Sequence, residues 1–406
     1  MALRKRQVGY LANRSETTDT EPRANIDRRQ CHRYSTRKTG LQEAMNVGDI
    51  AHQRLRNQQI ARSAFTEPCE VVRWMGAMQA QDYLGALWAV GLRLPSATEH
   101  SIEQALAEKA IVRTWPMRGT IHFLAAADAR WMLELLTPRV IQRSKGRLRE
   151  LGLDATIIAA SADVIVKTLE GGKQLPRNAL YDVLEDAHIA TGDSRGLHIL
   201  GQLAHERLIC FGARAGKQPT FALFDEWVPG AKSLPRDEAL ATLALRYFTG
   251  HGPATVHDFM WWTGLIAADA RNGLAAVAAQ LQCDMVDGQQ YYAGQELPFA
   301  ASPEHSQGQA FLLPPFDEFL VAYRDRSAAL DANDAKQVMP GSNGIFYPIV
   351  VIDGRVVGIW KRAFKSDRVV LTFSPFRPWS ETETRAIEAA AEHYGAFVGK
   401  TAVMSD

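Results

Sequence analysis

Cysteines are few in this sequence, and none is placed for metal binding. No C-x-x-C pair occurs, and no histidine lies at metal-ligand spacing from a cysteine. The four cysteines are Cys31, Cys69, Cys210 and Cys283. A structural zinc, an iron–sulfur cluster and a disulfide framework are therefore poorly supported, and a reducing cytoplasm is the favoured compartment.

Long hydrophobic runs and the common catalytic motifs are also missing. The longest apolar stretches, such as 85–92 and 346–352, fall far short of the ~20 residues that a bilayer span needs. The segment Gly212–Lys217 has only three residues between its glycines, and Gln218 follows where a phosphate loop has Ser or Thr. No G-x-S-x-G, H-E-x-x-H or G-x-G-x-x-G pattern occurs. These absences argue against a membrane protein, a nucleotide hydrolase, a serine esterase and a zinc protease.

The balance of charge differs along the chain of 406 residues. Residues 1–44 carry ten Lys/Arg against five Asp/Glu, a balance of +5, which leaves −4 for the remainder because the whole chain is +1. The composition of 1–44 predicts a disordered basic tail. A solvated tail or a start codon placed too far upstream is favoured over an arm that grips phosphates. Nucleic-acid binding by the folded part requires a local basic surface.

One order of predicted elements occurs three times after residue 44. Each copy has three helices followed by two short extended runs, which is the pattern of a winged helix. The third copy has Asp287-Gly288 between its extended runs, a strong hairpin signal. We therefore predict a mainly α fold with β wings. Its expected divisions are a tail at 1–44, winged helices at 45–150, 151–232 and 233–300, and a β-rich domain with a terminal helix at 301–406.

Two glutamines follow the first predicted apolar helix. In extended backbone, Gln79 and Gln81 point to the same side because side chains alternate along a strand, so they can converge on one small target. In the other interpretation they cap the helix end and satisfy loose backbone groups, and composition alone favours that structural role.

Basic residues gather after Pro138. Arg139 and Arg143 are i, i+4 neighbours on a helix, and Lys145 and Arg149 form another such pair. Phosphate binding needs such local density, although a solvated helix face would look the same. The predicted DNA-binding residues are Arg139, Arg143, Lys145, Arg147 and, between the strands of the first wing, Arg118.

Five separated segments together resemble the AlkZ-like winged-helix DNA glycosylases, a family that includes the YcaQ branch. The resemblance covers about residues 49–398 and leaves 1–44 outside. Its segments are Gln79-Ala80-Gln81-Asp82, Arg113 to His122, Gly252 to Thr255, Leu313 to Glu318 and Gly358 to Arg362.

The resemblance implies tandem winged helices around a basic concave face, and neither metal nor organic cofactor. It also implies that a glutamine–apolar–glutamine motif, matched here by Gln79 and Gln81, holds the water that attacks the anomeric carbon. A sister branch carries aspartate at the second position. The roles of Asp82 and Asp317 stay open, and Asp317 and Glu318 are interpreted as part of an ion-pair network with residues 324–326.

Two functions are compatible with these patterns. The favoured one is a monofunctional DNA repair glycosylase that removes N-alkylated purines, and interstrand crosslinks are a further candidate substrate. Its expected partner is double-stranded DNA with alkylated bases, and the protein would act as a monomer at the nucleoid without a membrane. The alternative is a winged-helix transcriptional regulator without catalysis, since a fold does not fix a function.

Overall fold

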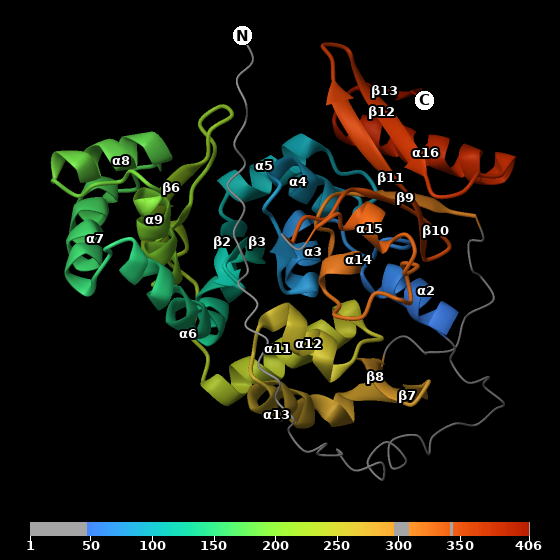
Figure 1. The fold of residues 1–406 in the computed structure, drawn as a ribbon, viewed down its shortest axis with the longest axis horizontal. Coiled ribbons are helices and arrows are strands. Elements are labelled where there is room, and N and C mark those ends of the chain that lie inside the picture. Colours follow the sequence, from blue (N-terminus) through green and yellow to red (C-terminus); the bar gives the residue numbers. More distant parts are fainter. Residues whose placement is uncertain (1–46, 296–307, 342–343, 406) are drawn as a thin grey trace.

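The computed structural model describes residues 47–295, 308–341 and 344–405 (Figure 1). The predicted tail at 1–44 lies outside the described residues. Helices and strands are both well represented, so the protein is a mixed α/β structure.

One order of elements occurs three times: a helix, a short strand or bridge, two helices and two strands. The first copy contains α3 (Pro68–Met75), β1 (Met78–Gln79), α4 (Tyr83–Gly91), α5 (Glu99–Ala107), β2 (Ile111–Met117) and β3 (Thr120–Ala125). The second contains α7 (Ala155–Leu169), β4 (Leu175–Pro176), α8 (Arg177–Asp186), α9 (Arg195–His205), β5 (Ile209–Phe211) and β6 (Thr220–Leu223). The third contains α11 (Arg236–His251), α12 (Val256–Thr263), α13 (Ala267–Val277), β7 (Leu281–Val286) and β8 (Gln289–Gly294). An isolated bridge between Ala254 and Tyr292 takes the place of the short strand in the third copy.

Reciprocal caps fix where several helices begin. Thr98 accepts from the backbone of Ser101, whose side chain in turn accepts from the backbone of Thr98. Ser101 is therefore the third residue of α5, which begins at Glu99. Thr255 and Asp258 cap α12 in the same way.

Gly250 lies within a helix and allows close packing. Helix α11 continues through Gly250 and ends at His251. A Cβ atom on Gly250 would lie 2.9 Å from the backbone oxygen of Trp74, so glycine lets α3 approach α11.

The longest helix, α6 (Ala126–Glu150), joins the first copy to the second. The sequence indicated a helix only after Pro138, yet Pro138 lies within α6. Pro138 has no N–H to donate to the preceding turn of the helix. The hydroxyl of its neighbour Thr137 donates to the Leu133 carbonyl at 2.7 Å. The first half of α6 is buried against β2 and α11, and the second half is largely exposed.

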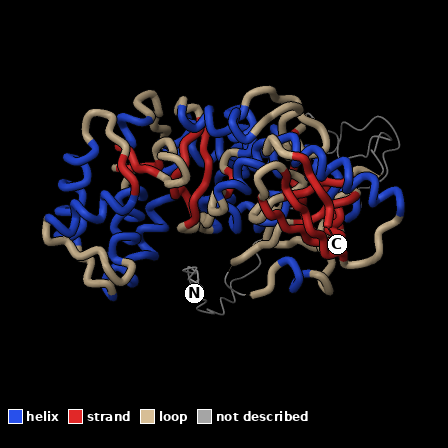
Figure 2. The backbone as a smooth tube through the Cα atoms, turned by 90° about the horizontal axis from the view of Figure 1, so that it is seen from above, coloured by secondary structure: helices blue, strands red, loops and turns tan. Residues whose placement is uncertain are grey.

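Strands of the first two copies form one sheet of six strands, in the order β1-β3-β2-β5-β6-β4. The copies meet where Arg113 of β2 pairs with Phe211 of β5. Strands β7 and β8 form a separate hairpin. Figure 2 shows the two larger sheets as separate groups of strands among helices.

The C-terminal part is a five-stranded sheet with a helix. It contains β9 (Ala310–Leu313), β10 (Ile349–Ile352), β11 (Arg355–Phe364), β12 (Arg368–Pro375), α16 (Glu381–Phe397) and β13 (Thr401–Ser405). This sheet shares a hydrophobic core with the first copy, because Trp88 of α4 packs against Tyr394 and donates to the carbonyl of Leu312 at 2.6 Å. The remaining elements are α2 (Val47–Asn57), α10 (Phe224–Trp227), η1 (Ala278–Gln280), α14 (Glu318–Val321) and α15 (Ala335–Val338).

Candidate active site around the Gln-Ala-Gln segment

Strand β1 is an edge strand, and its backbone is held on both sides. On one side, Gln79 is paired with His122, and the Ala80 N–H donates to the Ile121 carbonyl at 2.7 Å. On the other side, the Gln79 N–H donates to Oε1 of Glu318 at 2.8 Å. The carboxylate satisfies a backbone donor that no neighbouring strand reaches, so it fixes the position of Gln79.

Glu318 is a buried carboxyl group at the start of α14, with a relative exposure of 1%. Its Oε2 accepts from the indole N–H of Trp262 at 2.9 Å and lies 3.8 Å from Nε2 of His251. Burial raises the pKa of Glu318 to about 7, although Arg118 and the two hydrogen bonds oppose the rise. The carboxyl group therefore titrates near neutral pH.

The side chains of the two glutamines differ in their contacts. The amide group of Gln79 is partly buried and makes no hydrogen bond to the residues that the structure describes. Gln81 is exposed, and its Oε1 accepts from the Ile121 N–H at 3.2 Å. The backbone follows the predicted extended path as far as Ala80. The single side-chain oxygen of Gln81 accepts from a backbone N–H, so the alternative role of satisfying loose backbone groups applies to Gln81.

Two arginines contact Ala80 and Asp82, the other two residues named in the Gln79–Asp82 segment. Arg113 of β2 donates from Nη2 to the Ala80 carbonyl at 3.0 Å. Arg362 of β11 lies 3.3 Å from Oδ2 of Asp82, the residue that precedes α4. Four of the five segments that carried the resemblance therefore meet here, although they lie far apart along the chain.

Asp317 and Glu318 have separate environments, which corrects the expected ion-pair network with residues 324–326. Asp317 forms a buried, two-pronged ion pair with Arg93, at 2.9 Å for each oxygen. It also accepts from the Phe319 N–H at the start of α14. No local pattern indicates this pairing in advance, because Arg93 follows an apolar helix and lies 224 positions away.

Arg118, which the sequence predicted to bind DNA, lies at the turn between β2 and β3 with a positive φ of 56°. Its side chain is partly buried, and Nη2 lies 3.4 Å from Nε2 of His122. Burial, and then the charge of Arg118, lower the pKa of His122 to about 3, so this histidine is neutral at pH 7. Arg118 thus lies beside the edge strand, and a contact with DNA stays a prediction.

The other predicted DNA-binding residues lie together along the second half of α6. Arg143, Lys145 and Arg147 are exposed, and Arg147 pairs with Glu150 at 3.0 Å. Arg139 is partly buried, and its Nε has no hydrogen-bond partner. Partial burial, and then Arg139, lower the pKa of Arg143. We call these four residues the α6 basic segment.

The described ranges hold neither a metal cluster nor a membrane span. Residues 47–295, 308–341 and 344–405 contain no group of three or more His, Cys, Asp or Glu side chains arranged to hold a metal ion. Across the same ranges, no helix combines the length and hydrophobicity needed to cross a membrane.

Known proteins match both the sequence and the fold. The sequence model of the family described as "DNA glycosylase AlkZ-like" matches residues 72–397. The interstrand DNA cross-link repair glycosylase of Streptomyces sahachiroi is 24% identical over 339 residues, which cover 81% of this chain and 90% of that protein. The solved structure of the S. sahachiroi DNA glycosylase AlkZ has a TM-score of 0.73 at 23% identity, covering 89% of this chain and all of that one. Because the family match spans most of the sequence, the chain belongs to the AlkZ-like DNA glycosylases and is a DNA repair enzyme rather than a transcriptional regulator.

Proposed function

We propose that Gln79 and Gln81 hold the water that hydrolyses the N-glycosidic bond of an N-alkylated purine in duplex DNA. An N7-alkylated purine is already cationic, so it leaves as a neutral base and needs no general acid. The sugar develops oxocarbenium character, as in glycoside hydrolysis. A neutral amide carbonyl then suffices to accept a hydrogen bond from the water and to position it for attack.

The contacts of β1 are what support this role most strongly. The Gln79 backbone is held by the Glu318 carboxylate and by strand β3, while its side-chain amide is left without a protein partner among the described residues. A fixed backbone with an uncommitted amide is the arrangement that a water-holding group requires, because catalysis depends on donors and acceptors that are already in place.

We further propose that the three copies of the repeated element order are winged-helix modules and that DNA contacts the α6 basic segment. Helix α6 connects the first copy to the second, so phosphates bound there would lie between the two modules. Three modules within one chain can enclose a lesion without a partner subunit. We therefore propose a monomer that acts on the chromosome in the cytoplasm.

Interstrand crosslinks are included among the proposed substrates. The S. sahachiroi relative carries crosslink repair in its name, and it covers 81% of this chain. A crosslink through purine N7 has the same cationic leaving group on each strand, so one hydrolysis step unhooks it.

The test is release of a base from a defined lesion. We expect the enzyme to convert a duplex with one N7-methylguanine into an abasic site, detected as strand scission after alkali. A duplex with the two strands joined through guanine N7 should be unhooked under the same conditions. If no alkylated duplex loses a base beyond spontaneous depurination, the proposed function is wrong.

A further inference from the structure

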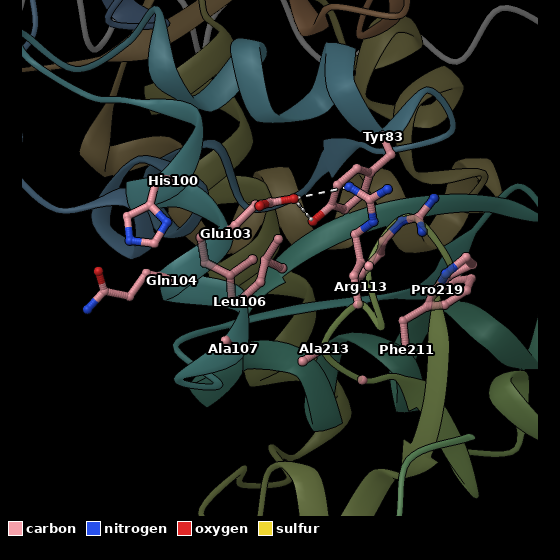
Figure 3. A pocket seen from close by; sticks show the side chains of 14 residues that line it. Tyr83, His100, Glu103, Gln104, Leu106, Ala107, Arg113, Phe211, Ala213 and Pro219 are labelled. Carbon is pink, nitrogen blue, oxygen red and sulfur yellow. Dashed lines mark hydrogen bonds and ion pairs between the residues drawn. The ribbon is translucent and has the colours of Figure 1, made fainter. Parts of the chain in front are cut away.

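The two faces of the six-stranded sheet carry different groups of side chains. Directly paired residues of antiparallel strands point to the same face, and Gln79 and Thr114 are both paired with His122. These three side chains therefore share one face. Arg113 points to the other face, where it pairs with Phe211 and both line a cavity of about 330 Å³ (Figure 3). Groups that act beside the Gln79 side chain lie on the face of His122.

Arg118 connects that face to helix α12. Nδ1 of His122 donates to the Thr120 carbonyl at 2.9 Å, so Nε2 of the neutral ring is the acceptor that faces the Arg118 guanidinium at 3.4 Å. A Cβ atom on Gly264, at the end of α12, would lie 3.7 Å from Cγ of Arg118. Trp261 precedes Gly264 by three positions, the spacing of neighbours along one side of a helix. Trp261 therefore lies near the face that carries Gln79.

Trp261 is an exposed aromatic residue whose ring is held in place. Its relative exposure is 44%, and its indole N–H donates to the Val321 carbonyl of α14 at 3.1 Å. The Arg326 guanidinium lies 5.3 Å from the centre of the ring, and Nε of Arg326 donates to the Leu320 carbonyl at 2.9 Å. An exposed ring that is already fixed can stack on a flat ligand at little cost in conformational entropy.

Two guanidinium groups give this region positive charge. Within the described ranges of the chain, neither Arg118 nor Arg326 forms an ion pair. Burial lowers the pKa of Arg326 to about 10; the Asp258 carboxylate opposes this change and the charge of Arg118 adds to it. Both arginines are therefore cations at neutral pH. An exposed ring beside such groups is complementary to a nucleotide, whose base stacks and whose phosphate accepts charge-assisted hydrogen bonds.

We propose that Trp261 stacks against an unpaired base of the bound DNA and that Arg118 and Arg326 bind the adjoining phosphate, a contact beside Gln79 that rests on the proposed function. A base in an intact duplex has both of its flat faces covered by its neighbours. Bases at damaged or mispaired positions cost less to unstack, so a stacking residue favours binding at such positions. Trp261 is thus a residue that determines specificity, and it does not hold the water.

An unpaired adenine tests the contact without catalysis. The two probes are a fully paired duplex and the same duplex with one additional, bulged adenine. Stacking of one base on an aromatic ring corresponds to about a fivefold to hundredfold change in affinity, so the wild type should bind the bulged duplex more tightly by that factor. With 2-aminopurine as the bulged base, fluorescence should fall on binding because stacking quenches it. Equal affinity for the two duplexes, or unquenched fluorescence, would overturn the proposal.

Two variants separate stacking from packing. Trp261→Phe and Trp261→Leu both lose the hydrogen bond to the Val321 carbonyl, so any structural effect of that loss is common to them. The phenylalanine variant keeps a flat ring and should retain most of the preference and the quenching, whereas the leucine variant should lose both. Val403→Ala, at an exposed apolar position of β13, is the control and should behave as the wild type. If Trp261→Leu still prefers the bulged duplex, the stacking assignment is wrong.

Excision rates separate this inference from the proposed function. On a duplex with N7-methylguanine, Trp261→Leu should need a higher enzyme concentration for half-maximal single-turnover rate and should approach the wild-type rate at saturation, because it loses binding and keeps the glutamines. Excision by a wild type that shows no preference for the bulged duplex would refute the stacking contact alone. A preference that depends on the ring, with no excision from any lesion, would refute the proposed function and leave the stacking contact in place.

Discussion

The backbone N–H of Gln79 donates to the buried carboxylate of Glu318, which lies 239 positions later in the chain, at 2.8 Å. The contact joins the edge of the first sheet to the helix that follows the C-terminal strand β9. Glu318 also accepts from Trp262 of the third copy, so three separate parts of the fold meet at this carboxylate. We regard Glu318 as a positioning residue, because it holds the backbone of Gln79 rather than the substrate.

Removing that carboxylate should slow excision without weakening DNA binding. In Glu318→Ala the Gln79 N–H loses its acceptor and β1 can shift, and a misplacement near 1 Å costs about a hundredfold in rate. Glu318→Gln keeps one oxygen acceptor and should retain more activity than alanine. Single-turnover rates beside binding titrations provide the measurement. Equal rates for alanine and wild type would show that the contact does not position Gln79.

Because of Glu318, the free energy of unfolding should decrease as pH rises toward neutrality. Its pKa in the fold is about 7 against an ordinary value of 4.5, so between these values the folded protein binds more protons than the unfolded chain. By linkage, the contribution of Glu318 to the free energy of unfolding is then greatest below pH 4.5, falls as pH rises and levels off above pH 7.

The permanently neutral Glu318→Gln should lack this fall. Denaturant unfolding at several pH values would show the difference between wild type and variant changing across the window. His122 and His251, whose pKa values in the fold are about 3, are present in both proteins and largely cancel from the difference. Parallel pH curves for the two proteins would contradict the assignment.

The α6 basic segment should bind DNA through its charge. Replacing Arg139, Arg143 and Lys145 with alanine should weaken binding to all duplexes about equally, and the slope of the salt dependence should fall by roughly 0.9 for each phosphate that is no longer neutralised. Arg385→Ala, at an exposed position of α16, is the control and should change little. A strong preference for one sequence in a selection experiment would argue against this mode of binding.

The ion pair between Arg93 and Asp317 should matter for stability. Asp317→Asn keeps an oxygen for the Phe319 N–H but leaves a buried arginine without its counter-charge. Breaking such a pair costs about 3–5 kcal/mol of unfolding free energy. The exposed Asp331→Asn is the matched control. Unchanged denaturant unfolding of Asp317→Asn would show that the charge is dispensable.

Local signals in the sequence predicted the order of elements well. Apolar periodicity and turn residues act within a few positions, and they indicated the three repeats and the terminal helix at 381–397. They missed the first half of α6, because Pro138 is typical of a helix boundary, and they missed β13, which pairs in parallel with β12. Both depend on packing against distant parts of the chain.

The site was predictable only in part for the same reason. Gln79 and Gln81 could be found because they are an unusual polar pair after an apolar helix. The contacts of Glu318 and Arg113 with that pair could not be found, because a contact between distant positions is decided by the tertiary fold. Arg118 was expected on the surface of a wing, and its side chain instead lies beside His122.

The most direct test of the account is single-turnover release of N7-methylguanine by glutamine variants. Gln79→Ala and Gln81→Ala should each be roughly tenfold to a thousandfold slower than wild type after spontaneous depurination is subtracted, with DNA affinity barely changed. Gln81→Asp should keep substantial activity because a carboxylate can hold the same water, and the exposed Gln337→Ala should match the wild type. If Gln79→Ala and Gln81→Ala both excise at the wild-type rate, the glutamines only satisfy backbone groups and the proposed site is wrong.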